Sequence, residues 1–263
     1  MTAPGTEAPP VLQVCLNGTR GPGDSAAVPM SPESLAESAA QAVEAGAREV
    51  RVHPRTPCGG TSLSPRVLAP VLASARAAVG APVRVTTDAA AEPDPERMVE
   101  RIHSWDVLPD LVSVDWHAPG AEKVAAALLE RGIGVEAALW ARTDGPALFA
   151  RSPLAPRVLR VAVRAPALNP NPVTGPSAEA AEAAEAAACS LLAELEPGLP
   201  PGTSVLLHGT DGGVWPVLRL ARRLGLAARI GLEDTLLLPD GTPARSNAEL
   251  VTAALAGRPE ETG

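Results

Sequence analysis

Short runs of β-branched and other apolar residues alternate along the chain with longer segments rich in Ala, Leu, Glu and Arg. The short runs have the length and composition of buried strands, and the longer segments have the apolar spacing of helices. This pattern predicts eight strands in succession, at 11–17, 49–53, 82–88, 111–117, 134–140, 158–164, 204–208 and 228–234.

Helix start and stop signals lie between these strands. Ser31-Pro32-Glu33 and Ser177-Ala178-Glu179 each combine a capping hydroxyl with an early acid, which favours a helix N-terminus. Glycines that can take the left-handed conformation after a helix are expected at four positions, Gly46, Gly80, Gly132 and Gly225. The low-complexity run 178–188 is interpreted as an exposed outer helix, and the Pro-rich stretches 166–176 and 197–201 as loops.

Eight strand–helix units in one chain of 263 residues predict an α/β fold, a (β/α)₈ TIM barrel. A doubly wound open sheet uses the same units, but typically fewer of them and with a Gly-rich first turn. We expect a disordered lead-in at 1–10, the barrel at 11–258 and a short tail at 259–263. The N-terminal residues lack the features of a signal peptide and no apolar run is long enough to span a bilayer, so a cytoplasmic protein is expected.

Charge and cysteine content narrow the function classes. The formal net charge of −8 argues against a nucleic-acid binder, which generally carries a clustered basic surface. The three cysteines, Cys15, Cys58 and Cys189, are far apart in sequence and suggest neither a disulfide framework nor a Cys-based zinc site. A small-molecule enzyme or binding protein remains.

Active sites of barrels form at the C-terminal ends of the strands, so polar residues there are the candidates. Three of the four histidines fall in this set, although each could also be a hydrogen-bonded structural residue. The candidates are Asn17, His53, Thr86, Thr87, Asp115, His117, Glu136, Arg164, His208, Arg229, Glu233 and Asp234. His53 and Glu233 end strands that are separated only by the first strand, and imidazole plus carboxylate suits zinc or a similar divalent metal.

Two other stretches carry candidate chemistry. A strand that ends in Glu233 and Asp234 after Arg229 indicates paired charges or a bound ligand, and alternation puts Arg229 and Glu233 on one side with Asp234 opening the loop. An internal ion pair between Arg229 and Glu233 is the structural alternative. The loop 209–213 could hold a phosphate or carboxylate on its backbone N–H groups, or be an ordinary flexible loop.

Several of these motifs together resemble a known family. The stretch R-I-G-L-E-D-T-L-L-L-P-D-G-T-P-A-R-S-N-A-E-L-V, from Arg229 to Val251, is similar to the C-terminal signature of the β-keto acid cleavage enzymes, whose founding activity is that of the 3-keto-5-aminohexanoate cleavage enzyme. Asn17-Gly18, the segment from Val50 to Arg55, S-V-D-W-H from Ser113 to His117, and Gly134-Val135-Glu136 agree in order, so the resemblance covers nearly the whole chain.

The resemblance implies a zinc-dependent barrel that converts a β-keto acid and acetyl-CoA into acetoacetate and a new CoA ester, as a homo-oligomer in amino-acid catabolism. It implies His53 and Glu233 as metal ligands, and Asp234 and Arg229 as acid–base and carboxylate-handling residues. Glu136 is implied as a further catalytic residue, and Thr86, Thr87 and Asn17 as residues lining the substrate pocket.

One position departs from the family pattern. The H-x-H metal motif of the family reads Arg51-Val52-His53 here, and a guanidinium cannot ligate zinc. Either His208 or His117 supplies the missing ligand and Arg51 faces the substrate, or Arg51 takes over the electrostatic task of the ion in a metal-free or degenerate barrel that binds a small carboxylate.

Overall fold

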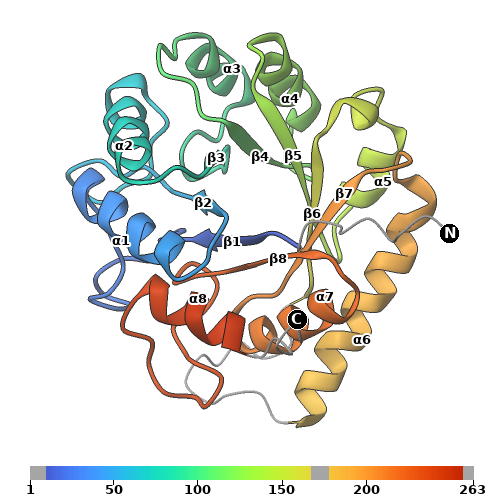
Figure 1. Ribbon diagram of the computed structural model, residues 1–263. Helices are drawn as coiled ribbons and strands as arrows, with labels where there is room; N and C mark the ends of the chain where they lie inside the picture. The colour runs from blue at the N-terminus through green and yellow to red at the C-terminus, as the bar shows by residue number, and fades with distance from the viewer. Residues whose placement is uncertain (1–9, 167–177, 257–263) are drawn as a thin grey trace, which may run out of the picture.

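The computed structural model describes residues 10–166 and 178–256, and within them eight parallel strands close into a barrel in sequence order, from β1 to β8. Figure 1 shows the helices surrounding this barrel. The predicted (β/α)₈ fold is confirmed. The strands are β1 (Leu12–Cys15), β2 (Glu49–Arg51), β3 (Val83–Thr86), β4 (Leu111–Asp115), β5 (Gly134–Trp140), β6 (Arg160–Arg164), β7 (Ser204–His208) and β8 (Ala227–Ile230).

The helices alternate with the strands as expected. They are α1 (Pro32–Glu44), α2 (Pro65–Ala78), α3 (Pro95–His103), α4 (Ala121–Glu130), α5 (Gly145–Arg151), α6 (Ala178–Leu195), α7 (Val214–Arg223) and α8 (Asn247–Ala256), with short 3₁₀ turns at Ala155–Arg157, Glu196–Gly198 and Asp211–Gly213. The run 178–188 does lie in an outer helix, α6. None of the described helices is both long and apolar enough to cross a membrane.

Local signals set most of the helix ends. Ser31 caps α1 and forms a reciprocal capping box with Ser34. Gly46, Gly132 and Gly225 have positive φ angles of 113°, 71° and 66°, as expected after a helix. The expectation for Gly80 was wrong, because α2 ends at Ala78 and its cap, Val79, is already extended. Gly80 therefore does not adopt the left-handed backbone conformation that favours glycine.

Of the two Pro-rich stretches predicted as loops, one lies in the described residues and the other lies almost entirely outside them. The stretch 197–201 is a connection as expected, although its first residues belong to a 3₁₀ turn. Of the stretch 166–176 only Pro166 is described, and Ser177 also lies outside the described residues, as do residues 1–9 of the expected lead-in and the whole expected tail, 259–263.

The apolar core lies between the strands and the helices. Val14, Val50, Val85 and Val112 sit at alternate strand positions with no exposed surface, as a strand packed against helices requires. The opposite faces of the strands carry polar and charged residues instead, among them Gln13, Arg51, Arg84, Glu136 and Arg229, all of which are buried. The interior of the barrel is therefore polar, and each charge in it needs a partner or a ligand.

Candidate active site

The turn after β8 brings two carboxylates into the barrel. The strand ends at Ile230 rather than at residue 234, and the backbone N–H groups of Asp234 and Thr235 both donate to the carbonyl of Gly231. A Cβ atom on Gly231 would lie 2.0 Å from the carbonyl oxygen of Cys15, so only glycine lets this turn lie against β1. Arg229 and Glu233 share one side as expected, and Asp234, which lies in the turn after the strand, also faces Arg229.

Arg229 holds both carboxylates. Its Nη2 atom lies 2.6 Å from Oδ1 of Asp234 and 3.2 Å from Oε1 of Glu233, and its Nε atom donates to the same Asp234 oxygen at 3.1 Å. Asp234 has no exposed surface, and its other oxygen, Oδ2, has no hydrogen-bond partner. The internal ion pair between Arg229 and Glu233, which the sequence left open as an alternative, therefore exists, and the Oδ2 atom of Asp234 is left without a partner.

The two carboxylates have opposite pKa shifts. Burial raises the pKa of Asp234 to about 6, with the negative charge of Glu233 adding to burial and Arg229 opposing it. Burial would also raise the pKa of Glu233, but the guanidiniums of Arg51 and Arg229 outweigh it and lower that pKa to about 2. Glu233 is thus ionised at neutral pH, whereas Asp234 can exchange a proton near neutral pH, as a general base or acid does.

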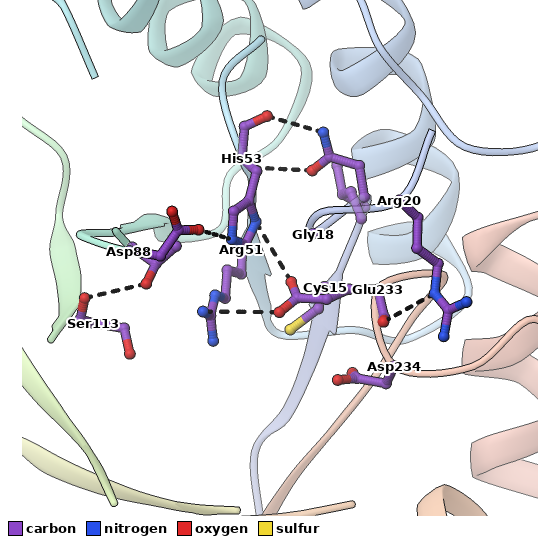
Figure 2. A network of polar contacts seen from close by, with 12 residues as sticks. Cys15, Gly18, Arg20, Arg51, His53, Asp88, Ser113, Glu233 and Asp234 are labelled. Carbon is purple, nitrogen blue, oxygen red and sulfur yellow. Dashed lines mark hydrogen bonds and ion pairs between the residues drawn. The ribbon is translucent and has the colours of Figure 1, made fainter. Parts of the chain in front are cut away.

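His53 lies between two carboxylates, as Figure 2 shows. Its Nδ1 atom is 3.5 Å from Oε2 of Glu233, which confirms that the ends of β2 and β8 converge, and its Nε2 atom is 3.4 Å from Oδ2 of Asp88. The sequence reasoning did not select Asp88, although it is the last residue of the expected strand 82–88. Its carboxylate at a strand end was the signal that could have found it.

Asn17 fixes the backbone of His53. Its amide donates to the His53 carbonyl oxygen and accepts from the His53 N–H, both at 2.9 Å. Asn17 has no exposed surface. Both ends of this side chain are thus occupied by the chain itself, so the contacts of Asn17 position His53.

Arg51 points into the barrel beside Glu233, with its Nη2 atom 3.8 Å from Oε1 of Glu233. Its Nε atom is buried and has no hydrogen-bond partner. Arg51 thus shares the site with His53 and Glu233, as expected of a residue at the first position of the H-x-H motif.

A second group of residues supports the turn from outside. Arg20 donates from Nε to the carbonyl of Glu233 at 3.2 Å and from Nη2 to Oδ1 of Asp211 at 2.7 Å. The backbone N–H of Asp211 in turn donates to the carbonyl of Asp234 at 2.7 Å. Arg55 in turn donates to the carbonyl oxygens of Gly18 and Arg20. The sequence reasoning selected neither Arg20 nor Arg55, and their loop positions carry no local signal for this role.

Two backbone N–H groups of the loop 209–213 are already engaged by the chain itself. The N–H groups of Asp211 and Gly213 donate to carbonyl oxygens of Asp234 and Thr210, and Asp211 adds a negative charge. The loop instead supports the turn after β8, and the phosphate-binding alternative gains no support from it.

The remaining candidates lie elsewhere in the barrel. The hydroxyls of Thr86 and Thr87 both donate to the carbonyl of Ser113. Glu136 is the third residue of β5 and pairs with Arg160 and Arg84, in a buried network near the N-terminal ends of the strands that also includes Glu49. Glu136 is therefore not brought together with Arg229 and Asp234.

Aromatic and cationic residues line the C-terminal mouth. The guanidinium of Arg164 lies 4.2 Å from the ring centroid of Trp140, and the ring of His117 packs against Trp140 at 4.6 Å. Trp140, Arg142 and Arg164 line a cleft of about 210 Å³. His208, the last residue of β7, is buried, and burial, followed by the charges of Arg229, Arg164 and Arg51, lowers its pKa well below the ordinary value, so it is neutral.

The chain matches the model of the beta-keto acid cleavage enzyme family over residues 9–143 and 152–257. The protein belongs to this family. No curated protein matches the chain.

This β-keto acid cleavage enzyme family member is similar in fold to several solved structures. ObcA in a ternary complex with a C4-CoA adduct and oxalate has a TM-score of 0.63 at 18% identity, covering 86% of this chain and 62% of that chain. ObcA in a binary complex with oxaloacetate has a TM-score of 0.63 at 17% identity with the same coverage. A 3-hexulose-6-phosphate synthase has a TM-score of 0.52 at 18% identity, covering 92% and 99%. These likenesses show the fold, and the chain spans about three fifths of the length of ObcA.

The side chains at the site can be compared with the three ligands that a zinc ion would need in this family member. His53 and Glu233 offer a nitrogen and oxygens that suit zinc, but the third position is Arg51, a cation without a lone pair. Within the described residues, no three His, Cys, Asp or Glu side chains are grouped so as to hold a metal, and neither His208 nor His117 joins His53 and Glu233. The residues present do not fit the three-ligand site.

Proposed function

We propose that this protein cleaves a β-keto acid with acetyl-CoA as co-substrate, giving acetoacetate and the CoA ester of the remaining acyl group. Membership of the β-keto acid cleavage enzyme family supports this reaction class. The observation that carries the proposal within the site is the buried carboxylate of Asp234, whose Oδ1 is held by Arg229 while its Oδ2 remains free.

The reaction needs a proton to move at C2 of the β-keto acid. Removal of that proton lets C2 form a bond to the acetyl carbon of acetyl-CoA, after which the bond between C2 and C3 breaks and the CoA sulfur passes to the C3 acyl group. No atom is gained or lost overall: the acetyl group and the acyl group exchange partners. Asp234 takes this proton through Oδ2 and returns it in our proposal, and its pKa of about 6, close to neutral pH, supports that role.

The other residues prepare this step. Arg229 fixes the orientation of Asp234 through two hydrogen bonds to one oxygen, and burial keeps water from competing for the free oxygen. The cleft beside Trp140 and Arg164, at the ends of β5 and β6, is proposed to receive part of the substrates, since its surface combines an aromatic face with guanidiniums. Thr86 and Thr87 remain proposed pocket residues.

The test is direct. Untagged protein is incubated with acetyl-CoA and a panel of β-keto acids, and both acetoacetate and the new CoA ester are quantified by mass spectrometry. We expect equal amounts of the two products from at least one substrate, and a loss of about 100- to 10,000-fold in kcat for Asp234→Asn. The control is Glu185→Gln on the outer helix α6, which should retain full activity. Binding of a β-keto acid without conversion would overturn the proposal and favour a carboxylate-binding barrel.

A further inference from the structure

Arg51 has an unusual environment for a buried arginine. It is the last residue of β2, in register with Cys15 of β1 and Arg84 of β3, and only 7% of its surface is exposed. A guanidinium carries five N–H donors, and removing its charge from water is costly unless those donors find acceptors. The partners of Arg51 therefore indicate what the position is built for.

Arg51 is paired more weakly than Arg160, another arginine inside the barrel. Its Nη2 atom lies 3.8 Å from Oε1 of Glu233, too far for a hydrogen bond, and its Nε atom has no partner. Arg160, in contrast, donates from Nε to Glu136 at 2.7 Å and from Nη1 to Glu49 at 2.9 Å. All the buried donors of Arg160 have partners, whereas Arg51, like Arg84, keeps a buried N–H donor without one, and Arg51 is the one of these two that lies beside Glu233 and His53.

None of the carboxylates around Arg51 accepts a hydrogen bond from its Nε atom. Glu233 also faces Arg229 at 3.2 Å and His53 at 3.5 Å, so its negative charge is shared among three groups. Asp234, another carboxylate on which the charge of Arg51 acts, is engaged by Arg229 through its Oδ1 atom. The Nε atom of Arg51 and the Oδ2 atom of Asp234 are thus both buried in the barrel without a hydrogen-bond partner.

We propose that the guanidinium of Arg51 replaces a metal ion in this barrel and binds the carboxylate of the β-keto acid directly, so that the protein binds its substrate without a metal. A guanidinium presents parallel N–H donors that match the two oxygens of a carboxylate, and the contact is strong in a buried site. This inference deepens the proposed function and rests on it only for the chemical class of the ligand.

The first experiment measures metal binding, independently of turnover. Wild-type protein, Arg51→His and Arg223→His are incubated with zinc, passed through a desalting column and analysed by mass spectrometry for metal. Arg51→His completes a set of two histidines and Glu233, so it should retain about one zinc per chain, a level that His53→Ala in the same background removes. Arg223→His adds a histidine on the surface of α7, and it should retain less than about a tenth of an equivalent, like the wild type.

The second experiment measures carboxylate binding with acetoacetate as the probe, by titration calorimetry in the presence of EDTA. We expect wild-type protein to bind acetoacetate, and Arg51→Gln to bind it at least about tenfold more weakly. Arg51→Lys should have an intermediate affinity, because it keeps the positive charge but lacks the parallel N–H donors of a guanidinium. Circular dichroism of each variant establishes that it is folded. The zinc content of wild-type protein tests the inference even if a variant fails to fold.

The outcomes separate this inference from the proposed reaction. Near-stoichiometric zinc in wild-type protein that His53→Ala removes would overturn the inference, and so would equal affinity of wild type and Arg51→Gln for acetoacetate in EDTA. Metal-free protein that binds acetoacetate through Arg51 but converts no β-keto acid would leave the inference standing and overturn the reaction.

Discussion

Arg20 and Asp211 form an ion pair of 2.7 Å that joins the loop after β1 to the loop after β7, directly behind the turn that carries Glu233 and Asp234. Arg20 bonds the carbonyl of Glu233, and Asp211 bonds the carbonyl of Asp234. Neither side chain touches the free carboxylate oxygen. Together they hold the backbone from which both acids project.

Arg20→Ala should therefore lower catalysis without unfolding the protein. A displaced turn moves Asp234 relative to its substrate, and a misplacement of this kind lowers kcat by about 10- to 100-fold. The ion pair itself is partly exposed and contributes about 1 kcal/mol or less to stability. Steady-state kinetics should show the loss mainly in kcat, with Arg223→Ala on α7 as the control. A rise in KM alone would mean that Arg20 contacts substrate and does not position the turn.

Glu136→Gln should strongly destabilise the fold. Glu136 is 1% exposed and faces both Arg160 and Arg84, so its neutralisation leaves buried positive charge without its main partner. Breaking a buried pair in this way costs about 3–5 kcal/mol. Urea unfolding monitored by circular dichroism measures the difference, and Glu185→Gln on the surface should stay within about 0.5 kcal/mol of wild type. A small effect of Glu136→Gln would show that Glu49 alone satisfies the two arginines.

The same carboxylate predicts a pH dependence of stability. Burial opposes ionisation, but Arg160 and Arg84 outweigh it and lower the pKa of Glu136 from 4.5 to about 2 in the folded protein. Because the folded pKa lies below the unfolded one, this contribution is complete above pH 4.5 and is lost as the pH falls to about 2. The difference in unfolding free energy between wild type and Glu136→Gln should thus be constant at neutral pH and shrink below pH 4.5. A difference that stays constant down to pH 2.5 would contradict this pKa.

Gly231→Ala should disturb the closure of the barrel between β8 and β1. The added Cβ atom would lie 2.0 Å from the carbonyl oxygen of Cys15, and backbone atoms cannot move aside as a flexible side chain can. We expect a loss of about 1–3 kcal/mol or more in unfolding free energy. Activity should also fall, because Glu233 and Asp234 lie only a few residues after Gly231 and would be displaced with it. Gly21→Ala is the matched control, since its Cβ would meet nothing within 4 Å. Thermal unfolding of the two variants compares them, and equal melting temperatures would argue against a tight contact at Gly231.

By itself the sequence determined the succession of eight strands, the cap at Ser31 and the placement of His53, Arg229 and Glu233 near strand ends, because apolar period and capping are local properties. It also determined that position 51 holds a cation. The convergence of His53 with Glu233 followed from strand order alone, since β2 and β8 both flank β1.

How the polar residues divide between the two ends of the barrel depends on the closed arrangement of the strands. The close approach of Gly231 to Cys15 ends β8 early and turns Asp234 inward, and this depends on the register between strands that are over 200 residues apart in sequence. In the same way, Arg160 and Arg84 hold Glu136 near the N-terminal ends, while Asp88 and Arg20 come to the site from two different loops. Side-chain pairing across a closed barrel depends on the relative stagger of all the strands, and the local pattern of one strand carries no information about that stagger.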